Sequence, residues 1–265
     1  MHSALTIAGS DSGAGAGIQA DLKTFAAHGV YGTCAITAVT AQNTVGVTMW
    51  QAMPADLVTA QIEAIAEDIP PQAVKVGMLA NAAVTEAVAA AIAELDLPHV
   101  VVDPVMIAKG GDRLLEEEAI EAIRTELLPR AHVVTPNISE AEVLSGLRIT
   151  DIEGMRRAGK AILGLGPRLV IVKGGHLEGP ESVDVVTGIH EEFEVRGPRI
   201  PGRNTHGTGC TLSSAIAANL ARGLTDRAAI TRARQYLEGA IRHAPGLGRG
   251  HGPLQHFWGR YTENR

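Results

Sequence analysis

Cysteine is scarce in this chain. Its 265 residues include two cysteines, Cys34 and Cys210, which are too few for a disulfide framework and are typical of the reducing cytoplasm. Positive charge is not in excess either, because 23 lysines and arginines stand against 29 acidic residues and give a net charge of −6. The sequence offers no global electrostatic reason to bind nucleic acid, so we expect a cytoplasmic protein without a nucleic-acid partner.

Long apolar segments are also missing. Residues 1–3 carry no basic group and Asp11 interrupts the first apolar run, so we expect no targeting peptide. The longest charge-free stretch, residues 24–55, is rich in Gly, Thr, Gln and Asn and lacks the roughly 20 mainly apolar residues of a membrane span. This composition indicates buried strands whose polar groups face partners or a ligand, and we expect no association with membranes.

Three site patterns are absent as well. Neither H-E-x-x-H nor C-x-x-C is present to form a structural zinc site, and no G-x-S-x-G indicates an α/β-hydrolase. What the chain does contain is 45% hydrophobic and 20% charged residues, a balance that allows a sizeable core and is unlike that of disordered chains.

Strand-like and helix-like segments alternate along the chain. Apolar, β-branched runs predict strands at residues 4–8, 33–40, 74–78, 99–102, 132–135 and 169–173, and a hairpin at 182–187 and 191–195. Helical spacing and capping patterns predict helices at residues 18–28, 55–69, 82–95, 116–128, 138–145, from 151 onward, 210–222 and 225–243. The alternation predicts one α/β domain over residues 1–265, a three-layer αβα fold with a mainly parallel central sheet and helices on both faces.

Ligands of such sheets bind beyond the carboxyl ends of the strands. The segments that follow predicted strands are residues 9–17, 42–46, 103–112, 135–140, 173–176 and 204–210. Most of the unusual chemistry lies in them, so we expect the functional site at this edge of the sheet.

Two phosphate-binding patterns are matched only in part. The glycines of residues 13–17 leave Ile18 where the dinucleotide fingerprint needs its third glycine, and residues 22–55 contain no acid to hold a ribose. This argues against a nicotinamide oxidoreductase. Residues 154–161 match the P-loop except for Ala161, which has no hydroxyl for Mg²⁺, and they lie in a predicted helix, so we interpret the match as coincidental.

Residues 204–210 fit a different kind of phosphate site. Gly207 and Gly209 let the backbone approach a ligand closely, and the helix that follows points its N-terminal amides and positive dipole end at the same place. Such a site can stabilise a phosphoryl group in transit. The alternative is an ordinary glycine-rich turn before a helix, and spacing alone does not separate the two.

Charged residues follow three other predicted strands. Asp103 ends an apolar strand, where a carboxylate is costly unless it meets a cation or solvent. Lys173, and Lys109 in a loop with two glycines, are candidates for phosphate contacts. Asn137 and Glu140 admit two interpretations: a capping pair at a helix start, or a site where the Glu140 carboxylate lies near Mg²⁺.

Residues 8–21 closely resemble the opening of the hydroxymethylpyrimidine/phosphomethylpyrimidine kinases of thiamine biosynthesis, members of the ribokinase-like superfamily. The resemblance continues at residues 41–44, 75–79, 103–106, 135–137, 173–176, 204–210 and 250–253. It departs at Ala14, where the family usually has Gly, and Ala tolerates a positive φ poorly. The resemblance implies a ribokinase-like enzyme that uses ATP and Mg²⁺ to phosphorylate 4-amino-5-hydroxymethyl-2-methylpyrimidine to its monophosphate and then to its diphosphate. It also implies a homodimer.

The resemblance implies a substrate pocket as well. An aminopyrimidine presents an N–H donor beside a ring-nitrogen acceptor, and the amide of Gln42 matches that edge bidentately, as glutamine does with adenine. Asp21 and the Gly9 backbone would complete the pocket, with Met78 and Val105 as apolar walls.

Phosphoryl transfer depends mainly on positioning and charge stabilisation. By the resemblance, the catalytic residues are Gly207, Thr208, Gly209 and Cys210, through their amides, and Lys173. The contacts to ATP and its phosphates are Lys109, Asn137, Lys173, Thr205 and Gly207, and the Mg²⁺ ligands are Asp103 and Glu140. Related sugar kinases carry Asp as catalytic base at the position of Cys210. A helix N-terminus lowers a thiol pKa and nearby ATP charge opposes this, so base and positioning roles both stay open for Cys210.

Two other functions stay open. A pyridoxal kinase shares the superfamily and acts on a heteroaromatic ring with a hydroxymethyl group. A binding or regulatory relative would keep the fold without catalysis, although the intact segments 204–210 and 137–140 count against it.

Overall fold

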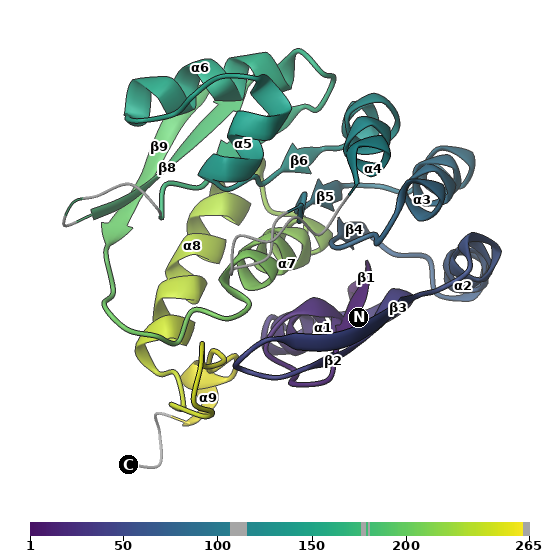
Figure 1. Ribbon diagram of the computed structural model, residues 1–265, viewed down its shortest axis with the longest axis horizontal. Coiled ribbons are helices and arrows are strands. Elements are labelled where there is room, and N and C mark those ends of the chain that lie inside the picture. The colour runs from purple at the N-terminus through teal and green to yellow at the C-terminus, as the bar shows by residue number, and fades with distance from the viewer. Residues whose placement is uncertain (107–115, 176–178, 180, 262–265) are drawn as a thin grey trace.

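A single sheet runs through the molecule. The computed structural model describes residues 1–106, 116–175, 179 and 181–261. Its strands are β1 (Ser3–Asp11), β2 (Tyr31–Gln42), β3 (Val47–Ala52), β4 (Ala73–Val76), β5 (Val100–Val102), β6 (Val133–Val134), β7 (Leu169–Val172), β8 (Glu181–Gly188) and β9 (Glu192–Pro198). They pair in the order β3-β2-β1-β4-β5-β6-β7-β8-β9. From β2 to β7 the neighbours are parallel, whereas β3, β8 and β9 are antiparallel to the strands they join (Figure 1).

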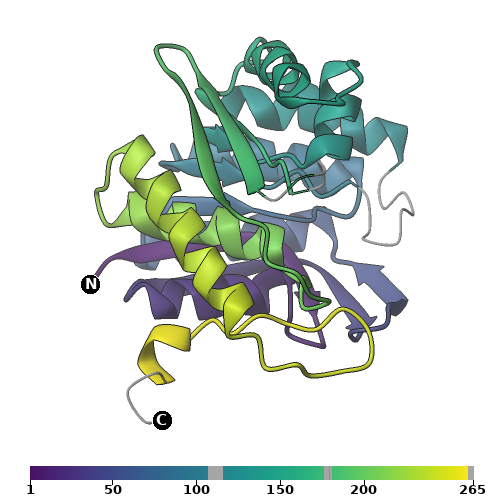
Figure 2. The same cartoon turned by 90° about the vertical axis from the view of Figure 1, so that its left-hand side faces the viewer.

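Helices cover both faces of this sheet. They are α1 (Gly17–Ala27), α2 (Ala55–Asp68), α3 (Ala82–Glu94), α4 (Glu117–Ala122), α5 (Ile138–Ser145), α6 (Ile152–Leu163), α7 (Thr208–Ala221), α8 (Asp226–Arg242) and the short α9 (Trp258–Tyr261). Figure 1 shows α2, α3 and α4 next to one another on one side, and Figure 2 shows α8 in yellow-green in front of the sheet. The predicted three-layer αβα architecture is confirmed.

Two apolar cores hold the layers together, one on each face. Alternate side chains of a strand point to opposite faces. In β1, Leu5 and Ile7 therefore join the core under α2 to α6, whereas Ala4 joins the core under α1, α7 and α8. The central strands are buried on both faces, which is why their sequences are almost continuously apolar.

Three segments differ from the sequence prediction. The helix expected at residues 116–128 is α-helical only to Ala122. It continues as a π-helical turn, η1 (Ile123–Leu127), and a 3-10 turn, η2 (Leu128–Arg130), at Pro129, whose missing amide hydrogen and bulky ring disfavour an α-helix. Strand β3 and helix α9 were not predicted. Among the described helices, none is long and apolar enough to cross a membrane.

Candidate active site

The first turn of α7 lies at the carboxyl edge of the sheet. Gly207 begins the helix with φ of 81° and no side chain caps it. The first amides of a helix have no acceptor within it, so those of Gly209 and Cys210 face the space in front of α7. A Cβ at Gly207 would lie 1.8 Å from the carbonyl oxygen of Gly15, so only glycine lets these two loops meet.

An ion pair lies against this helix start. Lys173 Nζ is 2.8 Å from Asp103 Oδ1, and a Cβ at Gly209 would lie 3.2 Å from both Lys173 Nζ and Asp103 Oδ2. Burial alone would lower the pKa of Lys173, but Asp103 and Glu140 outweigh it and raise the pKa. The structure thus brings a permanent cation to the amides of α7, as expected for a site that receives negative charge.

Asn137 and Glu140 form a capping box at the start of α5. The Asn137 amide donates to Glu140 Oε2 at 2.7 Å, and the Glu140 amide donates to Asn137 Oδ1 at 3.0 Å. The capping interpretation is therefore confirmed. Burial and the nearby charge of Asp103 raise the pKa of Glu140 to about 7, although Lys173 opposes the shift.

The donor set around Glu140 suits Mg²⁺. Asp103 and Glu140 offer carboxylate oxygens, the ligands that Mg²⁺ prefers, and a cation would relieve the repulsion that raises the pKa of Glu140. Within the described residues, no group of three or more His, Cys, Asp or Glu side chains could hold a metal ion. A magnesium ion here would therefore keep several of its waters, as it commonly does in phosphoryl-transfer sites.

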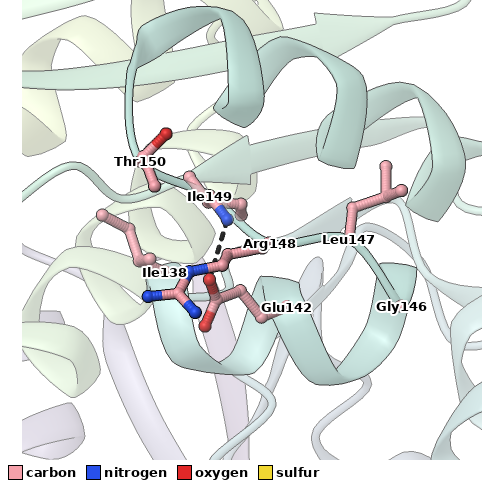
Figure 3. A pocket seen from close by; sticks show the side chains of 7 residues that line it. All are labelled: Ile138, Glu142, Gly146, Leu147, Arg148, Ile149 and Thr150. Carbon is pink, nitrogen blue, oxygen red and sulfur yellow. Dashed lines mark hydrogen bonds between the residues drawn. The ribbon is translucent and has the colours of Figure 1, made fainter.

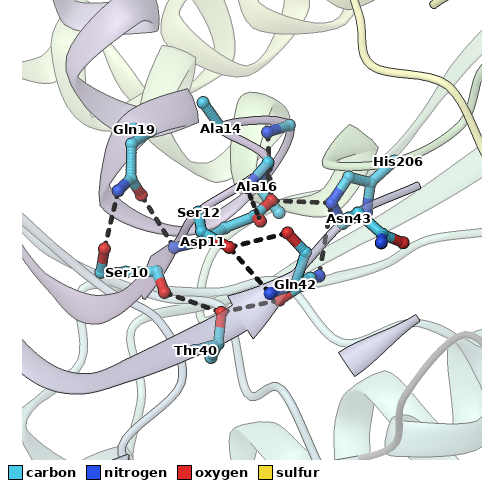
Figure 4. Close-up of polar contacts among 12 residues, drawn as sticks. Ser10, Asp11, Ser12, Ala14, Ala16, Gln19, Thr40, Gln42, Asn43 and His206 are labelled. Atoms are coloured by element: carbon cyan, nitrogen blue, oxygen red, sulfur yellow. Dashed lines mark hydrogen bonds and ion pairs between the residues drawn. The ribbon is translucent and has the colours of Figure 1, made fainter. Parts of the chain in front are cut away.

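Asp11 organises the glycine-rich loop between β1 and α1. Its carboxylate accepts hydrogen bonds from the amides of Gly13, Gly15 and Ala16 at 2.8–3.0 Å, and from Nε2 of His206 at 2.8 Å (Figure 4). Burial would raise the pKa of Asp11, but the hydrogen bonds from His206, Ala16 and Gly13 together lower it. A negative carboxylate thus joins the glycine loop to the segment that leads into α7.

His206 also reaches Gln42. The Gln42 side-chain nitrogen lies 3.4 Å from His206 Nε2, which already donates to Asp11, so this contact would set two donors against each other. The opposite amide orientation lets Gln42 Oε1 accept from His206 and its nitrogen donate to Thr40 Oγ1. The Thr40 hydroxyl then donates to the Ser10 carbonyl at 2.9 Å, and no two donors face each other.

The other expected pocket residues end neighbouring strands. Met78 and Val105 are half-buried after β4 and β5. A Cβ at Gly9 would lie 3.0 Å from Met78 Cε, so Gly9 and Met78 are in contact, while Thr205 leads into α7. Lys109 lies outside the described residues.

Comparison with known proteins identifies the family. A family model described as phosphomethylpyrimidine kinase matches residues 11–255. The hydroxymethylpyrimidine/phosphomethylpyrimidine kinase of Streptomyces coelicolor is 50% identical over 254 residues, which are 96% of this chain and 94% of the relative. The chain belongs to the phosphomethylpyrimidine kinase family.

Solved structures agree with this assignment. Phosphomethylpyrimidine kinase from Clostridium difficile superposes with a TM-score of 0.82 at 44% identity, covering 91% of this chain and all of that one. An ADP complex of Bacillus subtilis pyridoxal kinase gives a TM-score of 0.91 at 38% identity, covering 98% of this chain and 99% of that chain. The expected ribokinase-like fold and kinase family are confirmed.

Asp21, one of the expected substrate contacts, is enclosed by other side chains. Asp21 has no exposed surface, and its carboxylate already accepts hydrogen bonds from Thr6 (2.6 Å), Lys75 (2.8 Å) and Ser214 (2.6 Å). Without a ligand, the Asp21 carboxylate therefore meets only groups of the protein, and its contact with a pyrimidine stays a prediction.

Cys210 is not the activated thiol that its place in a helix N-terminus favours. Burial raises the pKa of Cys210 to about 11, and Asp21 and Asp103 add to the rise while Lys75 opposes it. The thiol is thus protonated at neutral pH when no ligand is bound. Burial thus disfavours the thiolate that a base role for Cys210 needs, in contrast to the carboxylate at this position in the related sugar kinases.

A separate surface pocket lies beside α5. It has a volume of about 620 Å³ and is lined by Ile138, Glu142 and residues 146–150, where Glu142 accepts a hydrogen bond from the amide of Ile149 (Figure 3). Apart from Ile138, which directly follows Asn137, none of these residues belongs to the segments expected to form the site. We therefore place the candidate active site at the strand ends and not in this pocket.

Two site residues were not predicted individually. Asp11 and His206 lie inside recognised motifs, but they are 195 positions apart, and nothing in the spacing indicates that they meet. The presence of one acid in a glycine-rich loop and one histidine in a glycine-rich turn was the only available indication.

Proposed function

We propose that the protein transfers phosphoryl groups from ATP in two steps, first to the hydroxyl of 4-amino-5-hydroxymethyl-2-methylpyrimidine and then to the phosphate of the product, for thiamine diphosphate synthesis. Relatives named for both activities, 44–50% identical over nearly the whole chain, support this. The observation that carries the proposal is the meeting of the α7 amides, the Asp103–Lys173 pair and the glycine-rich loop at one edge of the sheet.

In this proposal the substrate oxygen bonds to the γ-phosphorus while the bond from that phosphorus to the leaving ADP oxygen breaks. In the first step the acceptor hydroxyl also loses its proton, which passes to water. The amides of Gly209 and Cys210 and the ammonium of Lys173 stabilise the negative charge of the group in transit. Gly207 and Thr208 hold these amides in place, and Thr205 and Asn137 contact the nucleotide phosphates with Lys173.

Asp103 and Glu140 hold the magnesium ion through their carboxylates and its waters. When bound, the ion neutralises phosphate charge, and Lys109 supplies a further cation to the nucleotide. Because the Cys210 thiol is protonated without ligand, we assign Cys210 primarily to positioning the acceptor oxygen.

Gln42 reads the pyrimidine edge in this proposal. Its half-buried side chain lies beside His206 and the glycine-rich loop, where its amide has neighbours that fix its plane. Gly9, Met78 and Val105 line the ring faces, because they follow the adjacent strands β1, β4 and β5.

Product analysis tests this function. Incubation of the purified protein with ATP, Mg²⁺ and the hydroxymethylpyrimidine is expected to release ADP and to give the monophosphate before the diphosphate in phosphorus NMR spectra. Absence of ADP release above that of the Lys173→Met variant would exclude the activity.

A pyridoxal kinase is the second candidate. Staphylococcus aureus pyridoxal kinase, solved with AMP-PCP and pyridoxal, has a TM-score of 0.91 at 34% identity to this chain. We expect kcat/KM to be higher for the hydroxymethylpyrimidine than for pyridoxal, measured with the same ADP-release assay. The reverse order would transfer the assignment to pyridoxal.

We also propose a cytoplasmic homodimer. The free thiols of Cys34 and Cys210 support the location. Large apolar side chains are exposed on the edge strand β3 and its neighbour β2, including Met49, Trp50 and Val39, and a second copy would cover them. Sedimentation analysis tests the assembly, and Met49→Glu is expected to shift it toward monomer, whereas Leu57→Glu on α2 is not.

A further inference from the structure

The backbone of Gln42 is held on two sides. The Ser12 hydroxyl, in the glycine-rich loop, donates to the Gln42 carbonyl at 2.7 Å and accepts from the Gln42 amide at 2.8 Å. On the other side, the pairing of β2 with β3 shifts its register between Ala41 and Gln42. Such irregularities in a sheet commonly re-aim a side chain next to an active site. The Gln42 carboxamide therefore starts from a fixed backbone (Figure 4).

Two polar groups lie beside this carboxamide. Its two heteroatoms are 3.4 Å from His206 Nε2 and 3.2 Å from Thr40 Oγ1. The single hydrogen of the Thr40 hydroxyl goes to the Ser10 carbonyl at 2.9 Å, so this hydroxyl can only accept from Gln42. His206 Nε2 donates to the Asp11 carboxylate at 2.8 Å, so it presents a donor. The favoured orientation places the amide nitrogen of Gln42 beside Thr40 and its oxygen beside His206.

The His206 imidazole is itself held in place. It keeps 15% of its side-chain surface exposed, and its partner Asp11 keeps 3%. A Cβ at Gly15 would lie 2.3 Å from His206 Cδ2, so the ring lies directly against the glycine-rich loop. The His206 backbone amide donates to the Gly252 carbonyl at 3.2 Å. The donor beside Gln42 therefore cannot turn away without losing its carboxylate partner.

A carboxamide held in this way can still bind a ligand. Its nitrogen carries two hydrogens and its oxygen has two acceptor positions. Thr40 and His206 occupy one of each, which leaves one donor beside one acceptor. The neighbours of Gln42 thus determine the order in which this donor and this acceptor face a bound ring.

We propose that His206 and Thr40 determine substrate specificity by fixing the order of oxygen and nitrogen in the Gln42 amide. This order accepts a ring whose exocyclic amino group lies next to an unprotonated ring nitrogen. It rejects the 4-oxo analogue, whose carbonyl and ring N–H present the reverse order, and the ring cannot turn over while its hydroxymethyl group faces α7. The inference rests on the proposed function, which assigns the pyrimidine edge to Gln42. His206 and Thr40 act through Gln42 and are positioning residues.

Equilibrium binding measures this selection without turnover. Isothermal titration calorimetry in the absence of ATP gives the Kd of the hydroxymethylpyrimidine and of its 4-oxo analogue. We expect the parent protein to bind the amino compound roughly 10–100-fold more tightly, which is the discrimination that one bidentate pair commonly supplies. A ratio near one, or no binding of the amino compound, would overturn the proposal.

Two variants each remove one neighbour of Gln42. His206→Phe keeps a ring against Gly15 without the donor, and Thr40→Val keeps the shape of the side chain without the acceptor. The amide can then turn over, so the ratio of the two Kd values should fall roughly threefold to tenfold in each variant. If these residues only supported the loop, both compounds would lose affinity equally, and an unchanged ratio would refute the proposal. The matched control is His190→Phe, an exposed histidine between β8 and β9, which should keep the parent ratio.

The orientation of the amide is also measurable in the unliganded parent protein, so the test does not depend on the folding of a variant. In NMR spectra, the side-chain amide protons of Gln42 should show NOEs to the Thr40 methyl group. NOEs to the His206 ring in their place would contradict the proposed order. The expected NOEs and Kd ratios in a protein that releases no ADP would refute the proposed function alone.

Discussion

Two aspartate–lysine pairs in this protein have the same geometry and different surroundings. The ammonium-to-carboxylate distance is 2.8 Å in both Asp21–Lys75 and Asp103–Lys173. The first pair has no exposed side-chain surface, whereas Lys173 keeps 16% of its surface exposed and Asp103 keeps 3%. Distance alone therefore says little about role. Access separates them: the enclosed pair meets only groups of the protein, whereas in the open pair Lys173 keeps surface from which we expect it to reach an incoming phosphate.

The neighbours of the two pairs differ in the same manner as their exposure. Asp21 is held by hydroxyl groups of the interior, from Thr6 and Ser214. Asp103 has Thr135 on one side and the glycine start of α7 on the other, where a ligand can approach. A carboxylate that shares its cation with an incoming anion needs such an opening.

The largest difference between the pairs should appear in stability. Lys75→Met leaves Asp21 charged in the interior, and breaking a buried pair in this way costs about 3–5 kcal/mol of unfolding free energy. Lys173→Met should cost about 1–2 kcal/mol, because the Thr135 hydroxyl still donates a hydrogen bond to Asp103. Urea denaturation followed by circular dichroism measures both values, and equal costs would contradict the distinction.

The effect on kcat should be larger for the open pair than for the enclosed pair. Lys173→Met removes the cation at the α7 amides, and loss of one such group typically lowers kcat about 10²–10³-fold. The matched control is Lys160→Met, since Lys160 is an exposed lysine that contacts Glu192 on the outer hairpin. ADP release at saturating ATP should fall in the first variant only. A similar fall in both would remove Lys173 from the site.

The two ends of α7 provide a smaller, sharper contrast. Gly207 and Gly223 have nearly the same φ, 81° and 80°, but a Cβ at Gly207 would strike Gly15 while one at Gly223 meets nothing within 4 Å. Alanine at Gly223 should cost about 1 kcal/mol of stability from backbone strain alone, with kcat unchanged. Alanine at Gly207 displaces the amides and should lower kcat roughly tenfold to a hundredfold. Equal kcat in the two variants would refute the role of the helix start.

The fold was predictable because its central strands are buried on both faces. Runs such as residues 100–102 and 169–172 are apolar throughout, and helical periodicity separates them. Strand β3 escaped prediction because nearly all of its residues are exposed, so no burial pattern distinguishes it from a loop. Its place at the sheet edge comes from pairing with β2, which a single segment does not encode.

A site residue was predictable where its own motif indicates its role. It was not predictable where the role depends on a partner far away in the sequence. The glycines of residues 207–209 indicate close backbone approach from their own sequence. Asp21 is predicted to be a pocket residue because its motif is near Gly9, but its enclosure depends on Lys75, 54 positions away. Long-range partners of this kind are absent from local sequence.

The smallest expected effect concerns the glycine-rich loop between β1 and α1. Ala14 adopts φ of 56°, a conformation that costs an alanine about 1–2 kcal/mol and a glycine almost nothing. Glycine also loses more entropy on folding, which offsets part of this strain. Ala14→Gly should therefore raise the free energy of unfolding by only about 0.5–1 kcal/mol, measured as a higher urea midpoint. Ala80→Gly, at φ of 70° between β4 and α3, is the matched control for strain release and should gain a similar amount. The Lys23 ammonium donates a hydrogen bond to the Ala14 carbonyl at 2.8 Å. If Ala80→Gly raises the free energy of unfolding and Ala14→Gly does not, this contact already compensates the backbone strain at Ala14. The loop would then be held by its contacts and not by its glycines.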